Sequence, residues 1–387
     1  MYIIFSPPNM FVMNTRYVVT NRRVDHEIIF SSPNDHLDPA LLSREQINND
    51  GKEEATMHVR YARITGNNDI VDFEDDPNDI VKLYPHLEND DADFGSTNYS
   101  LKFGSLAMFN DLYNDMCSAE GGDLLIFVHG YRNDLTKAIK NLGTLEKRYI
   151  RKGSPIKHLL LFTWPSQNRT IKYKNDIQDS IESGKALGRT LLKLQRFFQT
   201  FFQDGLNPVC GRKIHIMAQS SGARVLEYAM KYVKDWRHEL MLESIFTESI
   251  IMAGDVDSHA LELDQDLSYL CNLSSRVHVY NHKKDKALLI SNTFKNVFPR
   301  LGHKGVRNFA NLPTNVVMID ATDVKEETTF FENLANHWYY VTSESVVNDV
   351  IHTLNGVAAI DIVKESDSKR EAWPDRPNLF FIKGGDV

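Results

Sequence analysis

The sequence predicts an α/β protein of three layers, in which helices cover both faces of a mostly parallel central sheet. Short apolar runs at 124–128 and 158–163 are typical of strands that are buried on both faces. A long helical segment spans about 174–202, between two such runs. Strands that alternate with helices favour βαβ units, so the central sheet is expected to be parallel.

The core strands are expected, in chain order, at 124–128, 158–163, 214–217, 248–253, 276–280 and 315–319. The helices between and after them are expected at about 134–150, 174–202, 224–233 and 344–354. These elements place the core of the protein at residues 121–360.

An α+β extension is expected over residues 1–120, packed on that core. Its strand candidates are 16–20, 27–30 and 57–62. The acidic stretch 72–93 predicts a solvated loop, and a mobile flap over a site is the alternative. At the other end, residues 361–387 read as a polar, peripheral tail.

Composition excludes several classes of function. With 387 residues and 42% hydrophobic content the chain can bury a sizeable core, and its net charge of −8 argues against nucleic acid as a partner. No apolar run approaches the roughly 20 residues that span a bilayer. The first residues lack the features of a secretory signal. Cys117, Cys210 and Cys271 show neither metal spacing nor a disulfide framework, so a cytoplasmic protein is expected.

The most informative motif is Ala-Gln-Ser-Ser-Gly at 218–222, between an apolar run and a helical pattern. This is the strand, turn and helix context of a nucleophile elbow. A strained turn would expose Ser220, and crowding between the positions two before and two after it would require Ala218 and Gly222 to be small. The alternative is a Ser-Ser-Gly turn that caps an ordinary helix.

A serine nucleophile needs a base, and an acid that orients the base. Asp285 follows the strand at 276–280 and is the first candidate for the acid, although it could instead be a helix N-terminal Asp. Asp255 and Asp257 follow the strand at 248–253 and are alternative acids or residues that line the site.

The base is expected after the last core strand, at 315–319. His337 lies there, before the final helix, which fits the order Ser, Asp, His. His303 precedes the last strand and His352 lies inside the final helix, so both fit less well.

An oxyanion hole needs two backbone N–H donors. The sequence predicts them at Ser221, directly after the nucleophile, and at Tyr131, in the loop after the first core strand. Gly130 would allow this loop to approach the substrate closely. His129 is expected to be structural.

The chain resembles the α/β-hydrolase superfamily, and more closely a bacterial family of unknown function related to esterases and lipases. The shared motifs lie between about residues 15 and 355, at 17–22, 127–131, 162–166, 218–222, 253–257, 285–288, 300–302 and 336–339. The resemblance implies Ser220 as nucleophile, Asp285 as acid and His337 as base. Gln219 and Ser221 depart from the His and Met that such families usually carry beside the serine.

The favoured function is therefore a serine hydrolase of the carboxylesterase type, with an acyl-enzyme intermediate and a small-molecule acyl substrate. No metal and no organic cofactor are implied. A catalytically silent scaffold for protein interaction and an acyltransferase that uses the same triad are the alternatives.

Overall fold

The computed structural model describes most of the chain from residue 104 onward and parts of the region before it. The described residues are 15–22, 29–30, 55, 59–65, 80–83, 86–87, 104–166, 173–202, 210–236, 244–295, 298–324 and 336–384. Most of the acidic stretch 72–93 lies outside them.

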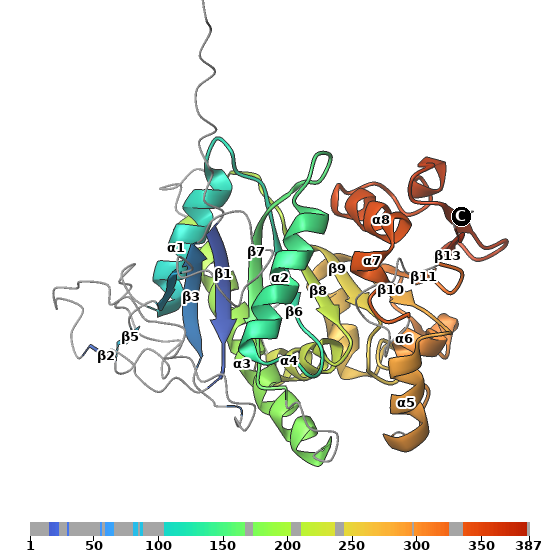
Figure 1. Ribbon diagram of the computed structural model, residues 1–387, viewed down its shortest axis with the longest axis horizontal. Coiled ribbons are helices and arrows are strands. Elements are labelled where there is room, and N and C mark those ends of the chain that lie inside the picture. Colours follow the sequence, from blue (N-terminus) through green and yellow to red (C-terminus); the bar gives the residue numbers. More distant parts are fainter. Residues whose placement is uncertain are drawn as a thin grey trace, which may run out of the picture.

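One eleven-stranded sheet forms the middle layer (Figure 1). Its strands are β1 (Thr15–Thr20), β3 (Arg60–Thr65), β4 (Ile80–Leu83), β6 (Asp123–Val128), β7 (Ile156–Thr163), β8 (Ile214–Gln219), β9 (Phe246–Met252), β10 (Ser274–Asn281), β11 (Val316–Asp320), β12 (Arg370–Ala372) and β13 (Leu379–Ile382). They lie in the order β12-β13-β11-β10-β9-β8-β6-β7-β1-β3-β4. The strands from β13 to β1 are parallel to their neighbours, and β12, β3 and β4 join antiparallel at the two ends.

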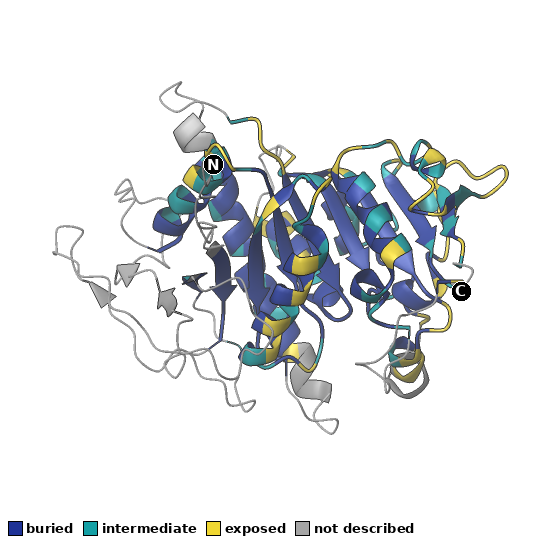
Figure 2. Cartoon of the chain, turned by 45° about the horizontal axis from the view of Figure 1, so that its top comes forward, coloured by how far each residue is buried: buried dark blue, intermediate teal, exposed yellow. Residues whose placement is uncertain are grey.

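Helices cover both faces of this sheet (Figures 1 and 2). They are α1 (Gly104–Cys117), α2 (Leu135–Tyr149), α3 (Tyr173–Phe202), α4 (Gly222–Trp236), α5 (Lys286–Lys295), α6 (Leu301–Lys304), α7 (Tyr339–Thr342) and α8 (Glu344–Leu354), with short 3₁₀ segments η2 (Asp266–Cys271), η3 (Phe309–Asn311) and η4 (Ile362–Lys364). Residues of α1, α3 and α4 pack into one hydrophobic core, and residues of α2, α7 and α8 pack into a second one. The chain therefore has the three-layer α/β/α architecture.

Strand β6 shows why the sequence produces two cores. Its side chains point alternately to opposite faces of the sheet. Leu124 and Ile126 belong to the first core, whereas Leu125 and Phe127 belong to the second. A continuous apolar run is therefore the pattern that a strand between two helical layers requires.

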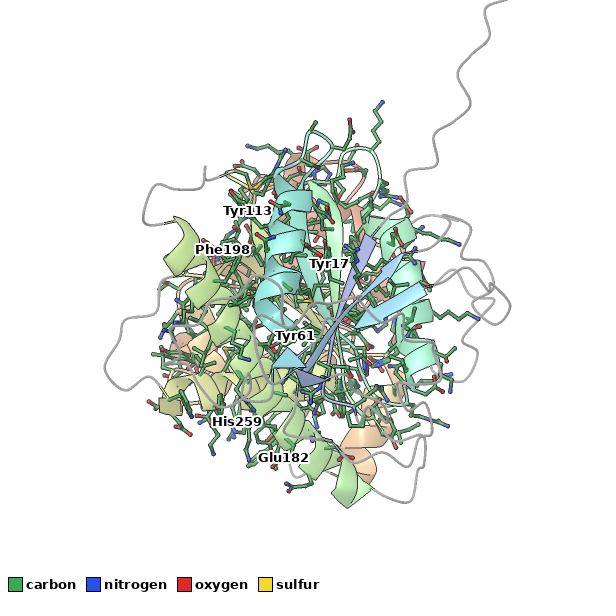
Figure 3. The ribbon with its side chains drawn as sticks, turned by 90° about the vertical axis from the view of Figure 1, so that its left-hand side faces the viewer. Tyr17, Tyr61, Tyr113, Glu182, Phe198 and His259 are labelled. Atoms are coloured by element: carbon green, nitrogen blue, oxygen red, sulfur yellow. A yellow bond between two sulfur atoms is a disulfide. The ribbon has the colours of Figure 1, made fainter. Side chains whose placement is uncertain are left out.

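The N-terminal region is part of the central sheet through β1, β3 and β4. Tyr17 on β1 donates a hydrogen bond to Asp115 on α1, with an O–O distance of 2.5 Å. Tyr113, also on α1, lies beside Phe198 on α3 with 6.5 Å between the ring centroids (Figure 3). The sheet thus crosses the boundary expected near residue 120.

The C-terminal segment also extends the sheet, because β13 pairs with β11 and β12 pairs with β13. Arg370 on β12 is fully buried and forms an ion pair with Asp349 on α8 at 2.6 Å. The hydroxyl of Tyr280 donates to the same carboxylate at 2.7 Å. The stretch expected as a peripheral tail after residue 360 therefore contributes two strands and a buried ion pair.

The expectation that the cysteines form no disulfide is wrong. Cys117 at the end of α1 and Cys210 before β8 form a disulfide, with a Cα–Cα distance of 5.3 Å. They are 93 residues apart in the sequence, so only the folded arrangement brings them together. Disulfides persist mainly in oxidising surroundings, so this bond does not support the predicted cytoplasmic location. That location is still a prediction. Within the described residues, no helix is both long and apolar enough to cross a bilayer.

Candidate active site

Ser220 lies in a tight turn between β8 and α4, at the carboxyl edge of the sheet. Its backbone is left-handed, with φ of 53°, which is uncommon for a residue other than glycine. Its N–H donates to the Met252 carbonyl at 3.0 Å, and its own carbonyl accepts from the Asp255 N–H at 3.0 Å. The elbow conformation is therefore tied to the end of β9 and the loop that follows it.

Gly222 is small because it faces the end of β6. A Cβ atom at this position would lie 2.4 Å from the Val128 carbonyl oxygen and 2.7 Å from that of His129. The sequence predicted that Gly222 must be small because it crowds against Ala218. The closest atoms instead belong to the neighbouring strand and its loop, so Gly222 allows α4 to begin close to β6.

Asp285 and His337 come together at this edge. His337 Nδ1 lies 2.7 Å from Asp285 Oδ2. The other carboxylate oxygen, Oδ1, accepts the Leu288 N–H at 3.0 Å in the first turn of α5. Both interpretations of Asp285 thus describe the same side chain, since one oxygen caps the helix and the other faces the histidine. Asp285 is completely buried and His337 nearly so.

Asp255 and Asp257 make different contacts. Asp255 lies 3.3 Å from the Arg224 guanidinium and 3.1 Å from that of Arg300, and its carboxylate accepts from the Ser221 hydroxyl at 3.4 Å. Asp257 pairs with Arg300 as well. These carboxylates pair with the buried guanidinium groups of Arg224 and Arg300, whereas the carboxylate at His337 is that of Asp285.

The loop after β6 approaches the elbow closely at Gly130. A Cβ atom there would lie 2.7 Å from Ser220 Cβ and 2.4 Å from Gln219 Oε1. Only glycine allows this approach, which places Tyr131 directly after the contact. On the elbow side, the Ser221 N–H donates to no carbonyl oxygen of the described residues. Both predicted oxyanion donors therefore belong to segments that meet at Ser220.

His129 holds the loop through both of its ring nitrogens. The Trp164 N–H donates to His129 Nε2 at 3.2 Å, so the ring proton is on Nδ1, which faces the Gly130 carbonyl at 2.8 Å. Burial and the nearby Arg22 lower the pKa of His129 to about 3. The ring therefore remains neutral and fixes the backbone of the loop.

Arg22 and Asn133 hold the same loop from the other side. One Arg22 nitrogen donates to the carbonyls of Asn133 at 2.8 Å and Trp164 at 2.5 Å, and the Asn133 amide donates to the Gly130 carbonyl at 3.0 Å. All of these side chains are buried. No role was predicted for Arg22, although it is the last residue of the shared motif at 17–22.

Gln219 is the other residue whose place the sequence did not reveal. Its Nε2 lies 3.0 Å from His337 Nε2. Within the described part of the chain, the hydrogen-bond partner of His337 Nε2 is thus Gln219 rather than Ser220. The sequence signal for this contact was the presence of a polar residue, Gln219, directly before the serine.

One group of residues has the spacing of metal ligands among those that the structure describes. His352, Glu365 and Asp367 each have a ligand atom within 4.8 Å of those of the other two. They lie on α8 and the segment after η4, and His352, the base candidate that fitted the chain order less well, lies 2.8 Å from Asp367.

A comparison with protein families agrees with this architecture. A family described as an alpha/beta hydrolase of unknown function matches residues 106–354. Among solved structures, phospholipase PlaB from Legionella pneumophila in complex with thio-NAD is similar over 67% of each chain, with 11% identity and a TM-score of 0.29. No curated protein matches the chain.

Proposed function

Because the chain belongs to this family of α/β-hydrolases of unknown function, we propose that it is a serine hydrolase that cleaves an acyl ester. The observation that carries the proposal is the contact between His337 and Asp285, 2.7 Å long, at the edge where the elbow presents Ser220. Asp285 holds the ring with Nδ1 toward the carboxylate. Nε2 is then the nitrogen that can take a proton.

In the proposed reaction, Ser220 Oγ forms a bond to the acyl carbon while its proton moves to His337 Nε2. The electrons of the carbonyl π bond move to the carbonyl oxygen, which becomes an oxyanion. When the oxyanion collapses, the bond to the leaving alcohol breaks and His337 returns the proton to the alcohol oxygen. Water then repeats both steps on the acyl-enzyme and releases the acid.

The Ser221 and Tyr131 N–H groups would stabilise the oxyanion. Backbone donors that are already in place need little reorganisation as the charge develops. The buried contacts of His129, Arg22 and Asn133 fix the loop that contains Tyr131, which supports this assignment. The substrate is expected to be a small acyl ester, and no step requires a metal or an organic cofactor.

A burst experiment tests the proposal. Wild-type protein mixed with short p-nitrophenyl esters should release a rapid first equivalent of p-nitrophenol, and intact-mass analysis should show the added acyl group. The variant Ser220→Ala should show neither. A silent scaffold predicts no hydrolysis across the whole ester panel, and that result would refute the proposal.

A further inference from the structure

Gln219 lies between the proposed base and the loop of the proposed oxyanion hole. It is the last residue of β8 and only 2% exposed. Its amide nitrogen lies 3.0 Å from His337 Nε2, and its amide oxygen points toward Gly130. The side chain therefore has a fixed place in the site.

The donor and acceptor chemistry of this contact determines the state of the ring. An amide nitrogen can only donate, so His337 Nε2 must accept and carries no proton. The ring proton is then on Nδ1, where it points to Asp285 Oδ2 at 2.7 Å. The two neighbours, on opposite sides of the ring, select the same neutral tautomer.

We propose that Gln219 is a positioning residue that holds His337 as the neutral base, with the Nε2 lone pair directed to the elbow until Ser220 engages it. This inference rests on the proposed serine hydrolase function. It assigns a role to the position directly before the serine, where the esterase-like and lipase-like families that the chain resembles usually carry His.

The same contact must break during turnover. Once Nε2 has taken the proton of Ser220, an N–H of the ring and an N–H of the amide would face each other, so the amide has to turn away. Before that point, the amide donor favours the neutral ring over the protonated ring. His337 should therefore remain a competent base at lower pH than it would without Gln219.

The other charged and titratable groups near the His337 ring also influence its titration. Among the described residues, Asp285 is the charged group that contacts His337. His282 and His303 sense the same carboxylate, but burial lowers the pKa of both, so both are neutral near pH 7. Lys284 and Lys304 are exposed cations near these two histidines.

The test is an NMR titration of free protein with ¹⁵N-labelled histidine, with the His337 signals assigned by their loss in His337→Gln. At neutral pH the wild type should show a protonated Nδ1 and a bare Nε2. Gln219→Met removes the donor and should move the His337 titration to higher pH. Gln219→Glu places a carboxylate at Nε2 and should move it further, by about one unit or more.

Gln265→Glu is the matched control, because it makes the same change of charge at the N-terminal end of η2. It should titrate like the wild type. A wild-type ring protonated at Nε2, or a Gln219→Met protein that titrates at or below the wild-type pH, would overturn the inference. The wild-type spectrum decides even where a variant does not fold. Since no readout depends on turnover, failure of the ester assay would be separately visible.

Discussion

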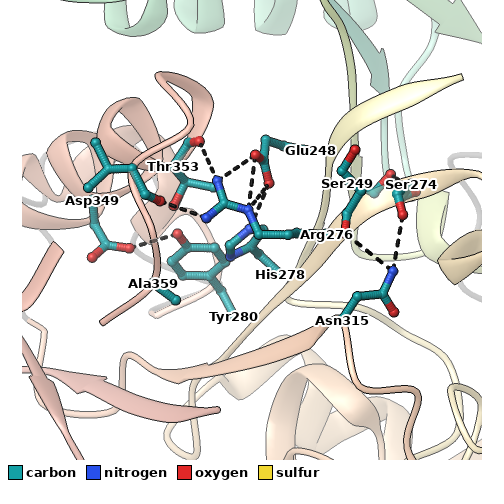
Figure 4. Close-up of polar contacts among 12 residues, drawn as sticks. Glu248, Ser249, Ser274, Arg276, His278, Tyr280, Asn315, Asp349, Thr353 and Ala359 are labelled. Atoms are coloured by element: carbon teal, nitrogen blue, oxygen red, sulfur yellow. Dashed lines mark hydrogen bonds and ion pairs between the residues drawn. The ribbon is translucent and has the colours of Figure 1, made fainter. Parts of the chain in front are cut away.

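His337 and His278 each contact a buried carboxylate, and the two pairs lie in different parts of the same sheet. His337 and Asp285 are in loops beyond the carboxyl ends of the strands, 2.7 Å apart. His278 and Glu248 are inside β10 and β9, 2.9 Å apart, beside α8 (Figure 4). Distance and burial alone do not separate the proposed catalytic pair from the other one.

The surroundings of the second pair explain its structural role. The Arg276 guanidinium donates to both oxygens of Glu248 (Figure 4). Burial raises the pKa of Glu248, but hydrogen bonds from His278 and Arg276 outweigh it and lower the pKa overall. Burial lowers the pKa of His278, so this pair is a neutral ring against an ionised carboxylate.

What differs is the group at the second ring nitrogen. His278 Nδ1 is buried and has no hydrogen-bond partner within the described residues. His337 Nε2 instead faces Gln219, one residue before Ser220. His337 Nε2 therefore lies at the elbow, within reach of the proposed nucleophile once the amide turns away, whereas His278 Nδ1 meets no polar group among the described residues.

Replacing each histidine by glutamine should give the largest difference between the two pairs. His337→Gln is expected to lower kcat for ester hydrolysis about 10⁴-fold or more, because the base is lost. His278→Gln should change kcat less than about tenfold and act on stability. Parallel assays of kcat and of urea unfolding check both, and equal losses of kcat would contradict the distinction.

The two carboxylates should also give opposite results. Asp285→Asn keeps an oxygen for the Leu288 N–H but no longer selects the correct tautomer, so kcat should fall about 10³- to 10⁴-fold with little loss of stability. Glu248→Gln leaves the Arg276 charge uncompensated and should lower the free energy of unfolding by about 2 kcal/mol.

Asp255→Asn serves as a control for the first of these variants. It removes a carboxylate near Ser220 that does not contact His337, and should mainly destabilise the fold. If Asp255→Asn lowered kcat as much as Asp285→Asn at equal stability, Asp255 would be the better candidate for the acid.

The smallest expected effect concerns acid stability. Because the pKa of His278 is lowered in the folded protein, the unfolded chain binds its proton first as the pH falls below about 6.5, which favours unfolding. Between pH 6.5 and 5 the free energy of unfolding of the wild type should fall by on the order of 1 kcal/mol more than that of His278→Gln. Urea unfolding at several pH values measures this, and parallel pH profiles would contradict it.

The central strands and the long helices could be predicted from the sequence because burial on two faces leaves a clear apolar pattern. The order of Ser220, Asp285 and His337 could also be proposed, since carboxyl ends of parallel strands meet at one edge of a sheet. The geometry places the last two in contact, and their catalytic roles remain proposals.

Other features depend on contacts that sequence spacing does not encode. Strands β12 and β13 are short and partly exposed, and their pairing becomes visible only beside β11. The bond between Cys117 and Cys210 depends on where α1 ends relative to β8. Likewise, Gln219 could be identified as unusual, but its contact with His337 joins residues 118 positions apart.

The central claim is that Ser220 is a nucleophile activated by His337, and that Asp285 orients His337. The most direct test is labelling with a fluorophosphonate probe, followed by peptide mapping that distinguishes Ser220 from Ser221. We predict an adduct on Ser220 in the wild type and in His278→Gln, and little or none in His337→Gln and Ser220→Ala. An adduct on another residue, or undiminished labelling of His337→Gln, would contradict the claim.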